Sequence, residues 1–374
     1  MSTETLAALG QGDGSQPVEL DWFGCDLRTG QIIEDLRSLK PSGPLTKRLG
    51  AATSTGFDLG IAGAGRDWLA ATDPGRSLLV GVDRLTDQPV WAGMVITRDA
   101  GSSWTAQLGV TTPEAYLDRR YTGDQTQLQQ DQAAVLAALM AAPLTQGPPF
   151  VMDAPSTGIL MDYTALDGDD RTVLSALQEV MGQDGGPEWT VDVAWSDTSH
   201  SGFVLPVRVR PAIGTQVAEP EAVFDFPGCI STYKLNESYE SGKGATAVVA
   251  RGEGEGAARL SSTSQVATDL EAAGWPRYVH RYTPATGLTD PAQLTAHAVK
   301  ALALMKTGAR VWAIEAVASQ APRLGRDWGI GDSVRVAVDT SPRHPDGAEI
   351  TARAWSWELD TAADRIVPVL IEEN

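Results

Sequence analysis

The sequence predicts a β-rich α+β protein of several domains. Short apolar runs bounded by Gly and Pro recur over residues 18–113 and again towards the C-terminus, as in an antiparallel barrel or sandwich. Between these two regions the apolar residues follow helical periodicity. With 374 residues, of which 42% are hydrophobic and 21% charged, the chain is long enough for about two to four ordinary globular domains.

The first region contains predicted strands joined by tight turns. Residues 22–36 (WFGCDLRTGQIIEDL) indicate a strand, a turn at residues 28–30 and a second strand over Gln31–Leu36. Further on, β-branched runs separated by polar links predict a meander. Its strands are expected over Leu78–Asp83, Val90–Thr97 and Trp104–Val110.

A helix is predicted directly after the meander. Thr111 and Pro113, with Glu114 three residues after the threonine, form the pattern of a capped helix start. A side-chain oxygen and a proline at these positions relieve the unpaired amides of the first turn. The β-rich region is therefore expected to end near residue 113.

The residues that follow predict an α+β domain. Apolar residues on one helical face indicate a helix over Gln125–Met140, and a second helix is expected over Arg171–Met181. Asp169 or Asp170 is expected to cap the second helix and to complement its dipole. A β-pair completes this domain, with strands expected over Glu188–Trp195 and Phe203–Val209.

Strand patterns return after residue 210. The expected strands are Ala222–Tyr233, Thr246–Arg251, Arg310–Ala318, Ser333–Asp339, Glu349–Leu359 and Ile366–Glu372. In Glu349–Leu359 the apolar residues change from even to odd positions. A β-bulge would explain this change, and so would burial of both faces by the barrel core and a neighbouring subunit.

One helix interrupts these strands. The Gly- and Glu-rich run at residues 252–256 opens the segment that contains it. Asp290 is the expected cap, Pro291 occupies the first position and Gly308 fits the left-handed position at the end.

Three stretches, Trp22–Leu36, Leu78–Tyr121 and Gly325–Glu358, resemble minor tail proteins of long-tailed actinobacteriophages. That family forms the baseplate hub and is similar to the N-terminal part of tail-associated lysins and to the hub of contractile tails. In the third stretch GIGDSVRV (Gly329–Val336) resembles the Gly-Asp turn that opens a strand of the second barrel. The residues agree, because Gly tolerates the backbone of a tight turn and Asp332 can accept hydrogen bonds from local amides.

The resemblance implies two tube-like antiparallel β-barrels with smaller α+β domains inserted. It also implies how the chain divides. The expected parts are a flexible N-terminal arm (1–16), a first barrel (17–113), an α+β domain (114–210), a second barrel (211–255 plus 308–374) and an inserted domain with one helix (256–307).

The family's role would make this chain a structural protein of the virion tail tip, synthesised in the host cytoplasm. Three subunits would present six barrels and so adapt the sixfold tail tube to a threefold tip. The implied partners are two further copies of the chain, the distal tail protein hexamer, the tape-measure protein and downstream tip or receptor-binding proteins. Phage DNA would pass through the enclosed channel without specific binding.

The chain is strongly acidic, with a net charge of −19. Such a surface repels a nucleic-acid backbone and excludes specific DNA binding. The charge can serve solubility alone, or it can keep the wall of a DNA channel from adhering to DNA. We expect no stable membrane insertion, because no apolar run approaches the roughly 20 residues of a membrane span and the N-terminus lacks a signal-peptide pattern.

No catalytic, cofactor-binding or metal-binding residues are predicted. Cys25 and Cys229 are 204 positions apart in the sequence, and we expect buried free thiols. Zinc, P-loop, dinucleotide and GxSxG signatures are absent, and the acidic run at residues 167–170 lacks the spacing of a calcium loop. His297 is expected within a helix and His344 in a solvated loop. The chain is therefore not expected to be an enzyme.

Tryptophan is unusually frequent, with eleven residues against six phenylalanines. Most are expected in the core, and some could anchor subunit contacts. The candidates are Trp22, Trp91, Trp328, Trp355 and Trp357. Two other functions stay open: a carbohydrate-binding tail-tip protein, and a tail-associated peptidoglycan hydrolase with an unrecognised carboxylate pair.

Overall fold

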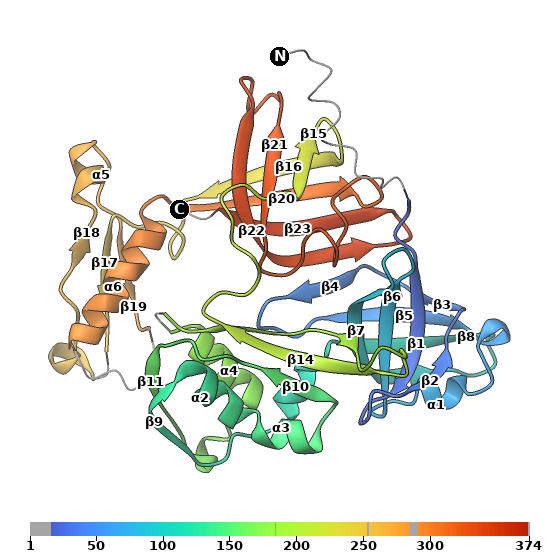
Figure 1. Cartoon of the computed structure of the whole chain (residues 1–374). Helices are drawn as coiled ribbons and strands as arrows, with labels where there is room; N and C mark the ends of the chain where they lie inside the picture. Colours follow the sequence, from blue (N-terminus) through green and yellow to red (C-terminus); the bar gives the residue numbers. More distant parts are fainter. Residues whose placement is uncertain (1–15, 184, 253, 285–290, 373–374) are drawn as a thin grey trace. The chain divides into compact units, whose positions relative to one another are not determined.

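The computed structural model describes residues 16–183, 185–252, 254–284 and 291–372 (Figure 1). They form two compact units. Unit 1 comprises the described residues within Met1–Met181, Pro187–Tyr233 and Ile314–Asn374, and unit 2 those within Gly182–Gly186 and Lys234–Ala313. Nearly all of the predicted arm (1–16) and the predicted cap Asp290 lie outside the described residues. The predicted fold class is confirmed: the chain is β-rich, with two large curled sheets and smaller α+β parts.

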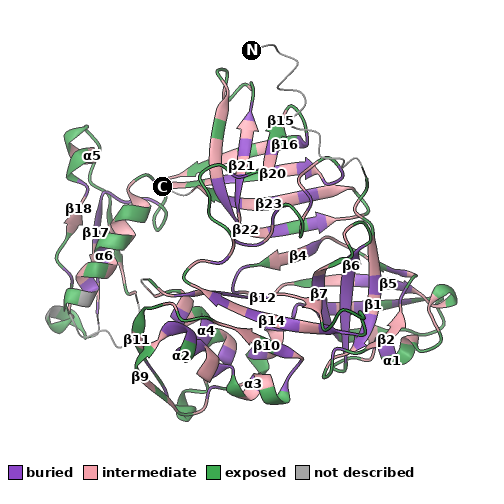
Figure 2. Cartoon of the chain, in the orientation of Figure 1, coloured by how far each residue is buried: buried purple, intermediate pink, exposed green. Residues whose placement is uncertain are grey.

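The first large sheet is antiparallel and has seven strands in the order β2-β1-β6-β7-β8-β5-β3. Its strands are β1 (Leu20–Asp26), β2 (Ile32–Asp35), β3 (Leu39–Pro41), β5 (Ser54–Gly60), β6 (Ser77–Asp83), β7 (Gln88–Asp99) and β8 (Thr105–Thr111), with short helices η1 (Ile61–Gly63) and α1 (Trp68–Ala71) between them. Every residue of β6 is buried (Figure 2). Since side chains alternate along a strand, both faces of this sheet are covered around β6.

Three aromatic side chains fill one face of the first sheet. Trp22 packs edge-to-face against Phe57 with ring centroids 4.9 Å apart, and Trp91 lies 5.6 Å from Phe57. Glycines make room for them, because a Cβ at Gly93 would lie only 2.4 Å from the Trp91 ring. Large rings opposite glycines allow the sheet to curl tightly around its own core.

The second large sheet also has seven strands, in the order β15-β21-β22-β23-β20-β16 with β4 paired to β22. Its strands are β4 (Leu45–Arg48), β15 (Val223–Phe226), β16 (Ile230–Ser238), β20 (Ala309–Val317), β21 (Ser333–Val338), β22 (Ala348–Asp360) and β23 (Arg365–Glu372). One pair departs from the predicted antiparallel pattern, since β15 runs parallel to β21. Of the two explanations for the changed apolar positions in this strand, the structure shows the bulge, because the register of β22 against β23 shifts between Ala354 and Ser356.

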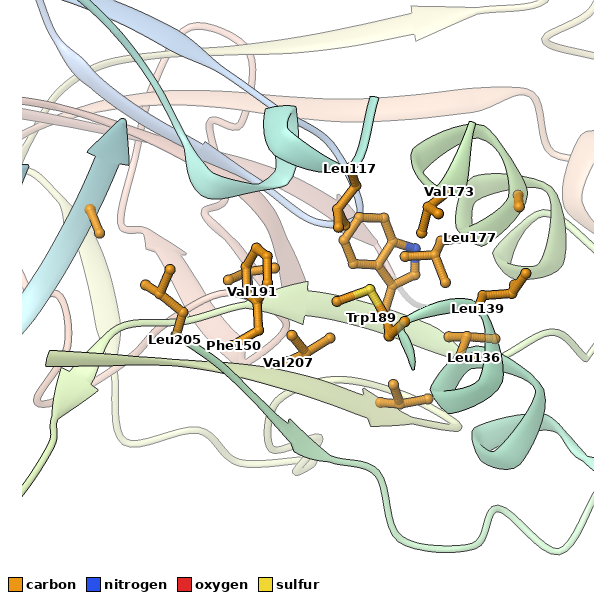
Figure 3. Packing of buried hydrophobic residues seen from close by; sticks show 14 of the residues in the cluster. Leu117, Leu136, Leu139, Phe150, Val173, Leu177, Trp189, Val191, Leu205 and Val207 are labelled. Atoms are coloured by element: carbon orange, nitrogen blue, oxygen red, sulfur yellow. The ribbon is translucent and has the colours of Figure 1, made fainter. Parts of the chain in front are cut away.

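The α+β part of unit 1 packs a small sheet against short helices. It comprises η2 (Pro113–Arg119), β9 (Gln125–Asp131), α2 (Gln132–Leu139), α3 (Ala141–Gln146), β10 (Phe150–Asp153), β11 (Leu160–Ala165), η3 (Asp167–Asp169), α4 (Val173–Met181), β12 (Glu188–Val191), β13 (Ala194–Trp195) and β14 (Phe203–Arg210). Trp189 lies at the centre of its core, beside Leu117 and Leu177 (Figure 3). The same cluster includes Leu78 and Val80 of β6, so this part covers one face of the first sheet.

The predicted helix over Gln125–Met140 is wrong in its first half. Residues Gln125–Asp131 form strand β9, paired with β11, and the helix begins only at Gln132. Asp131 fixes this start, because its side chain accepts a hydrogen bond from the amide of Ala133 at 2.9 Å. Cross-strand pairing and a strong cap therefore override the helical periodicity.

The predicted caps of two further helices, the one after the meander and the one over Arg171–Met181, are also wrong. At α4 the cap is Thr172, whose hydroxyl accepts from the amide of Ser175 at 3.2 Å, while Asp170 adopts a left-handed conformation. After the meander a 3₁₀ helix, η2, forms without a side-chain cap. The carboxylate of Glu114 is buried and binds Lys47 instead of the helix amides.

Unit 2 contains a three-stranded sheet in the order β18-β17-β19. Its elements are β17 (Ala247–Ala250), η4 (Gly256–Ala258), β18 (Gln265–Val266), α5 (Thr268–Ala272), β19 (Val279–Tyr282) and α6 (Pro291–Met305). Val248 and Ala250 pack against Leu294 and Ala298 of α6. The sequence placed β17 in the second barrel (211–255), which is wrong, because β17 pairs with β18 and β19. Every helix among the described residues is too short or too polar to cross a lipid bilayer.

The predicted Gly-Asp turn before β21 is confirmed. Asp332 accepts hydrogen bonds from the amides of Gly329 at 2.7 Å and Thr215 at 2.6 Å. Gly331 has a φ of +87°, and a Cβ at this position would lie 2.1 Å from the carbonyl oxygen of Ile213. Only glycine fits here, so the turn fixes where β21 begins.

Replacing Gly331 by Ala should destabilise the protein by about 2–4 kcal/mol, because the left-handed backbone and the clash with Ile213 both oppose a side chain. Chemical denaturation of the whole chain measures this change. Gly101→Ala is the matched control, since Gly101 has an ordinary φ and no atom within 4 Å of its added Cβ. Equal stabilities of the two variants would contradict the role of the turn.

Candidate functional site: the junction of the two large sheets

Strand β4 ties the two large sheets together. The chain leaves the first sheet after β3, contributes β4 to the second sheet and returns to the first as β5. Within the second sheet Thr46 lies opposite Glu358 and Lys47 opposite Trp357. The indole N–H of Trp91, from the first sheet, donates to the carbonyl of Thr46 at 3.1 Å. The two sheets therefore cannot separate without breaking strand hydrogen bonds.

A buried ion pair joins the same two sheets at a second point. Arg323, in the loop before β21, donates two hydrogen bonds to Asp83 at the end of β6, at 2.7 and 2.5 Å. The side chains are only 5% and 1% exposed. The guanidinium also donates to the carbonyl of Gln16 at 3.0 Å. Two parallel hydrogen bonds from a planar guanidinium to a carboxylate fix both distance and orientation, so this pair sets the relative position of the two sheets.

Two further ion pairs attach the α+β part. Lys47 of β4 binds Glu114 of η2 at 2.7 Å and also donates to the carbonyl of Val191 in β12. Arg353 of β22 makes a two-pronged contact with Glu188 of β12, with one bond of 2.7 Å. Both contacts are largely shielded from water. The second sheet is thus held to the α+β part through charges as well as apolar packing.

Arg353 is the most highly coordinated of these cations. Besides Glu188 it donates to the carbonyl of Gly331 at 2.9 Å and to that of Ile213 at 2.6 Å. Its guanidinium lies 5.2 Å from the centre of the Trp355 ring. These contacts use four of the five N–H donors of the guanidinium, which offsets much of the cost of removing its charge from water.

A cavity of about 850 Å³ lies within this junction. Pro89, Val90 and Trp91 line it from the first sheet, and Trp328 and Trp357 from the second. Its charged residues include Arg208, which pairs with Asp192, and Arg326, which pairs with Asp327. The described lining residues include no His and no Cys. These paired charges, together with the prolines and valines of the lining, indicate a structural contact between the two sheets.

The cysteine and histidine candidates do not assemble a hydrolytic site. Both cysteines are buried and free, as predicted. Burial raises the pKa of the Cys25 thiol far above its usual value and that of Cys229 to about 12, so neither thiolate is favoured. The prediction of a solvated His344 is wrong, because Nδ1 lies 2.8 Å from the Tyr233 hydroxyl and the residue is half-buried. Among the described residues, no cluster of three or more His, Cys, Asp or Glu could hold a metal ion.

The tryptophans proposed as subunit contacts serve the chain's own core instead. Trp22, Trp91, Trp328 and Trp357 are at most 5% exposed, so the prediction is wrong for these four. Trp355 is half-buried beneath Arg353. The exposed tryptophans are others: Trp104 is 75% and Trp275 43% exposed. Turn residues precede both of them, Ser103 before Trp104 and Gly274 before Trp275, but Trp328 has similar polar neighbours and is buried, so this signal does not separate them.

Sequence comparison identifies no relative for this chain: no family profile matches it. No curated protein matches it either. Solved structures do share its fold. A tail protein from Neisseria meningitidis matches with a TM-score of 0.59 and 13% identity, over 96% of this chain and 97% of that chain. A 43 kDa tail protein of a Shewanella oneidensis prophage matches with a TM-score of 0.57 and 12% identity, over 95% of this chain and 98% of that chain. A prophage tail protein from Listeria monocytogenes matches with a TM-score of 0.53 and 9% identity, over 94% of both chains. The chain therefore has a fold found in these tail proteins, over at least 94% of its length.

Replacing Arg323 by Met should cost about 3–5 kcal/mol, because it leaves the Asp83 carboxylate buried without its partner. Arg37→Met is the matched control. Arg37 pairs with Asp35 on the surface, where the side chains are 83% and 40% exposed, and its loss should cost far less stability than the loss of Arg323. Urea denaturation of both variants tests this, and a similar small loss in both would contradict a junction held by charge.

The contribution of Asp83 should depend on pH. Desolvation is the largest influence and raises the pKa of this carboxyl, but hydrogen bonds from Arg323 and the amide of Leu85, together with the Arg323 charge, bring it below its usual range. Because the folded pKa is depressed, the stabilisation is complete above the ordinary carboxyl pKa of about 4 and is lost as pH falls through the folded value.

The stability difference between the wild type and Asp83→Asn should therefore be large at neutral pH and narrow below pH about 4. Denaturant titrations of both proteins from neutral to acidic pH measure it. A difference that stays constant over the acid range would mean that the Asp83 charge does not contribute.

Proposed function

We propose that this protein is a structural hub of a phage tail. The observation that carries the proposal is the match of fold over at least 94% of both chains to three tail proteins. A match of this extent includes both large sheets and the smaller parts between them. Because the identities are only 9–13%, this match establishes a common fold. The proposed role is taken from the names of those structures, which describe them as tail proteins.

The hub would be a homotrimer. Each chain holds two seven-stranded sheets, which are tied together through the shared strand β4 and the buried pair Arg323–Asp83. Three such chains offer six sheets, which suits a ring that meets a sixfold tube on one side and a threefold tip on the other. A fixed relation between the two sheets of each chain is what such a ring requires.

The net charge of −19 supports a channel for DNA that does not bind it. Like charge prevents a phosphate backbone from adhering to the wall during passage. In this proposal the protein sits at the tail tip of a long-tailed phage of an actinobacterium. Its partners are the distal tail protein hexamer, the tape-measure protein and downstream tip or receptor-binding proteins, and it does not insert stably into membranes.

We further propose that the hub role is not enzymatic. The raised pKa of both thiols and the pairing of the charges at the junction support this view. The alternative is a peptidoglycan hydrolase with a carboxylate pair. A zymogram on host peptidoglycan distinguishes the two functions. A non-enzymatic hub should produce no clearing, whereas clearing that is lost with a single Asp or Glu substitution would establish the hydrolase instead.

The mass of the purified protein in solution tests the hub directly. Light scattering should give three times the 39.6 kDa of one chain, either alone or when mixed with the distal tail protein. The variant Arg323→Met should weaken this assembly, whereas Arg37→Met should not. A protein that stays monomeric at high concentration and ignores the distal tail protein would contradict the proposal.

A further inference from the structure

Unit 2 carries an exposed aromatic platform formed by Tyr239, Trp275 and Tyr278. The Tyr239 ring centre lies 5.3 Å from that of Trp275 and 5.2 Å from that of Tyr278. Tyr239 forms the base, whereas Trp275 and Tyr278 are 43% and 47% exposed. Rings that could have packed in a core thus present half of their surface to water, which indicates a binding role.

The platform is held rigidly by its backbone. The amide of Trp275 donates to the carbonyl of Leu270 at 3.0 Å, just after the left-handed Gly274 that ends α5. The amide of Tyr278 donates to the Thr246 hydroxyl at 2.8 Å, and its carbonyl accepts from the amides of Thr246 and Ala247. A ligand therefore meets rings that are already in place, and binding costs little ordering of the loop.

Tyr239 is fixed equally tightly from below. Its ring fills the space beside Gly244, where an added Cβ would lie 2.5 Å away, and beside Gly308, where it would lie 3.0 Å away. Its hydroxyl reaches the carbonyl of Lys306 at 3.4 Å. These contacts hold the Tyr239 ring in place beneath Trp275 and Tyr278.

The arrangement of the rings distinguishes a platform from a cage. A cage for a quaternary ammonium group needs space between its rings for the cation. Here the Tyr239 ring lies against each of the other two rings, so aromatic carbon occupies the space that a cage would leave for the cation. The ligand must lie across the exposed faces of the rings.

A charged pair comes from the same stretch of sequence as the exposed rings. Arg277, between the two exposed aromatic residues in sequence, holds Glu271 through two hydrogen bonds of 2.5 and 2.8 Å. The pair offers N–H donors and carboxylate acceptors together. A neutral sugar ring has one face of C–H groups, which suits the electron-rich face of an aromatic ring, and a rim of hydroxyls that both donate and accept.

We propose that Trp275 and Tyr278 form a binding site for neutral carbohydrate, of the kind found in cell-surface polysaccharides. The net charge of −19 opposes anionic ligands such as nucleic acid or uronate polymers. The exposed area of two half-exposed rings is also much smaller than the roughly 800 Å² per partner of a typical protein interface. The inference does not depend on the hub proposal, since it concerns unit 2 alone.

Affinity electrophoresis of the whole chain tests the site. Native gels contain one soluble polysaccharide each: laminarin, xyloglucan, galactomannan or hydroxyethylcellulose as neutral probes, and alginate as the acidic one. The wild type should be retarded by at least one neutral probe and not by alginate. Trp275→Ala should weaken that retardation about tenfold, as the loss of a central aromatic contact does, and Trp275→Phe should retain most of it.

Trp104→Ala is the matched control, because Trp104 is a highly exposed tryptophan of unit 1 and lies outside the platform. It should bind like the wild type, and circular dichroism should show that all variants are folded. No retardation by any neutral probe, or equal retardation of wild type and Trp275→Ala, would overturn the proposal. So would a change in solution mass on replacing Trp275, which would make the platform a protein contact. Failure here leaves the trimer result unaffected, so the two proposals are tested separately.

Discussion

The burial of charge between the two large sheets is the constraint on which unit 1 depends. Arg323 and Asp83 are almost fully removed from water and face each other across the junction. If the sheets moved apart, each ion would remain in a poorly solvated site without its partner, at a cost of several kcal/mol. Strand β4 and the pairs formed by Lys47 and Arg353 add further fixed points. The sheets and the α+β part therefore act as one body.

This rigidity relates the fold to the proposed role. A ring of subunits closes only if each subunit presents its surfaces at a defined angle. Apolar packing alone fixes such an angle loosely, whereas a two-pronged Arg–carboxylate pair permits one geometry. The cost of burying these ions is offset by hydrogen bonds to the carbonyls of Gln16, Ile213 and Gly331. The ion pairs Arg323–Asp83, Lys47–Glu114 and Arg353–Glu188 therefore fix how the parts of the junction are placed relative to one another.

Local patterns predicted most of the strands and the pairing of strands that are adjacent in sequence, but not the pairing of distant strands. The meander, the bulge of β22 and the Gly-Asp turn followed from alternation and turn chemistry, which depend on neighbouring residues. The transfer of β4 to the second sheet and the parallel pairing of β15 depend on residues more than a hundred positions away. For the same reason Arg323 and Asp83, 240 positions apart, gave no signal in the sequence. The helix expected over Gln125–Met140 failed because pairing with β11 outweighed a correct apolar periodicity.

Cryo-electron microscopy of the purified chain bound to its distal tail protein tests the central claim most directly. The account predicts a threefold ring in which the two large sheets of each chain occupy six similar positions around an open, acidic channel. Within each chain β4 should remain paired with β22, and Arg323 with Asp83. A single copy attached at the side of the distal ring, or two sheets that separate on assembly, would contradict it.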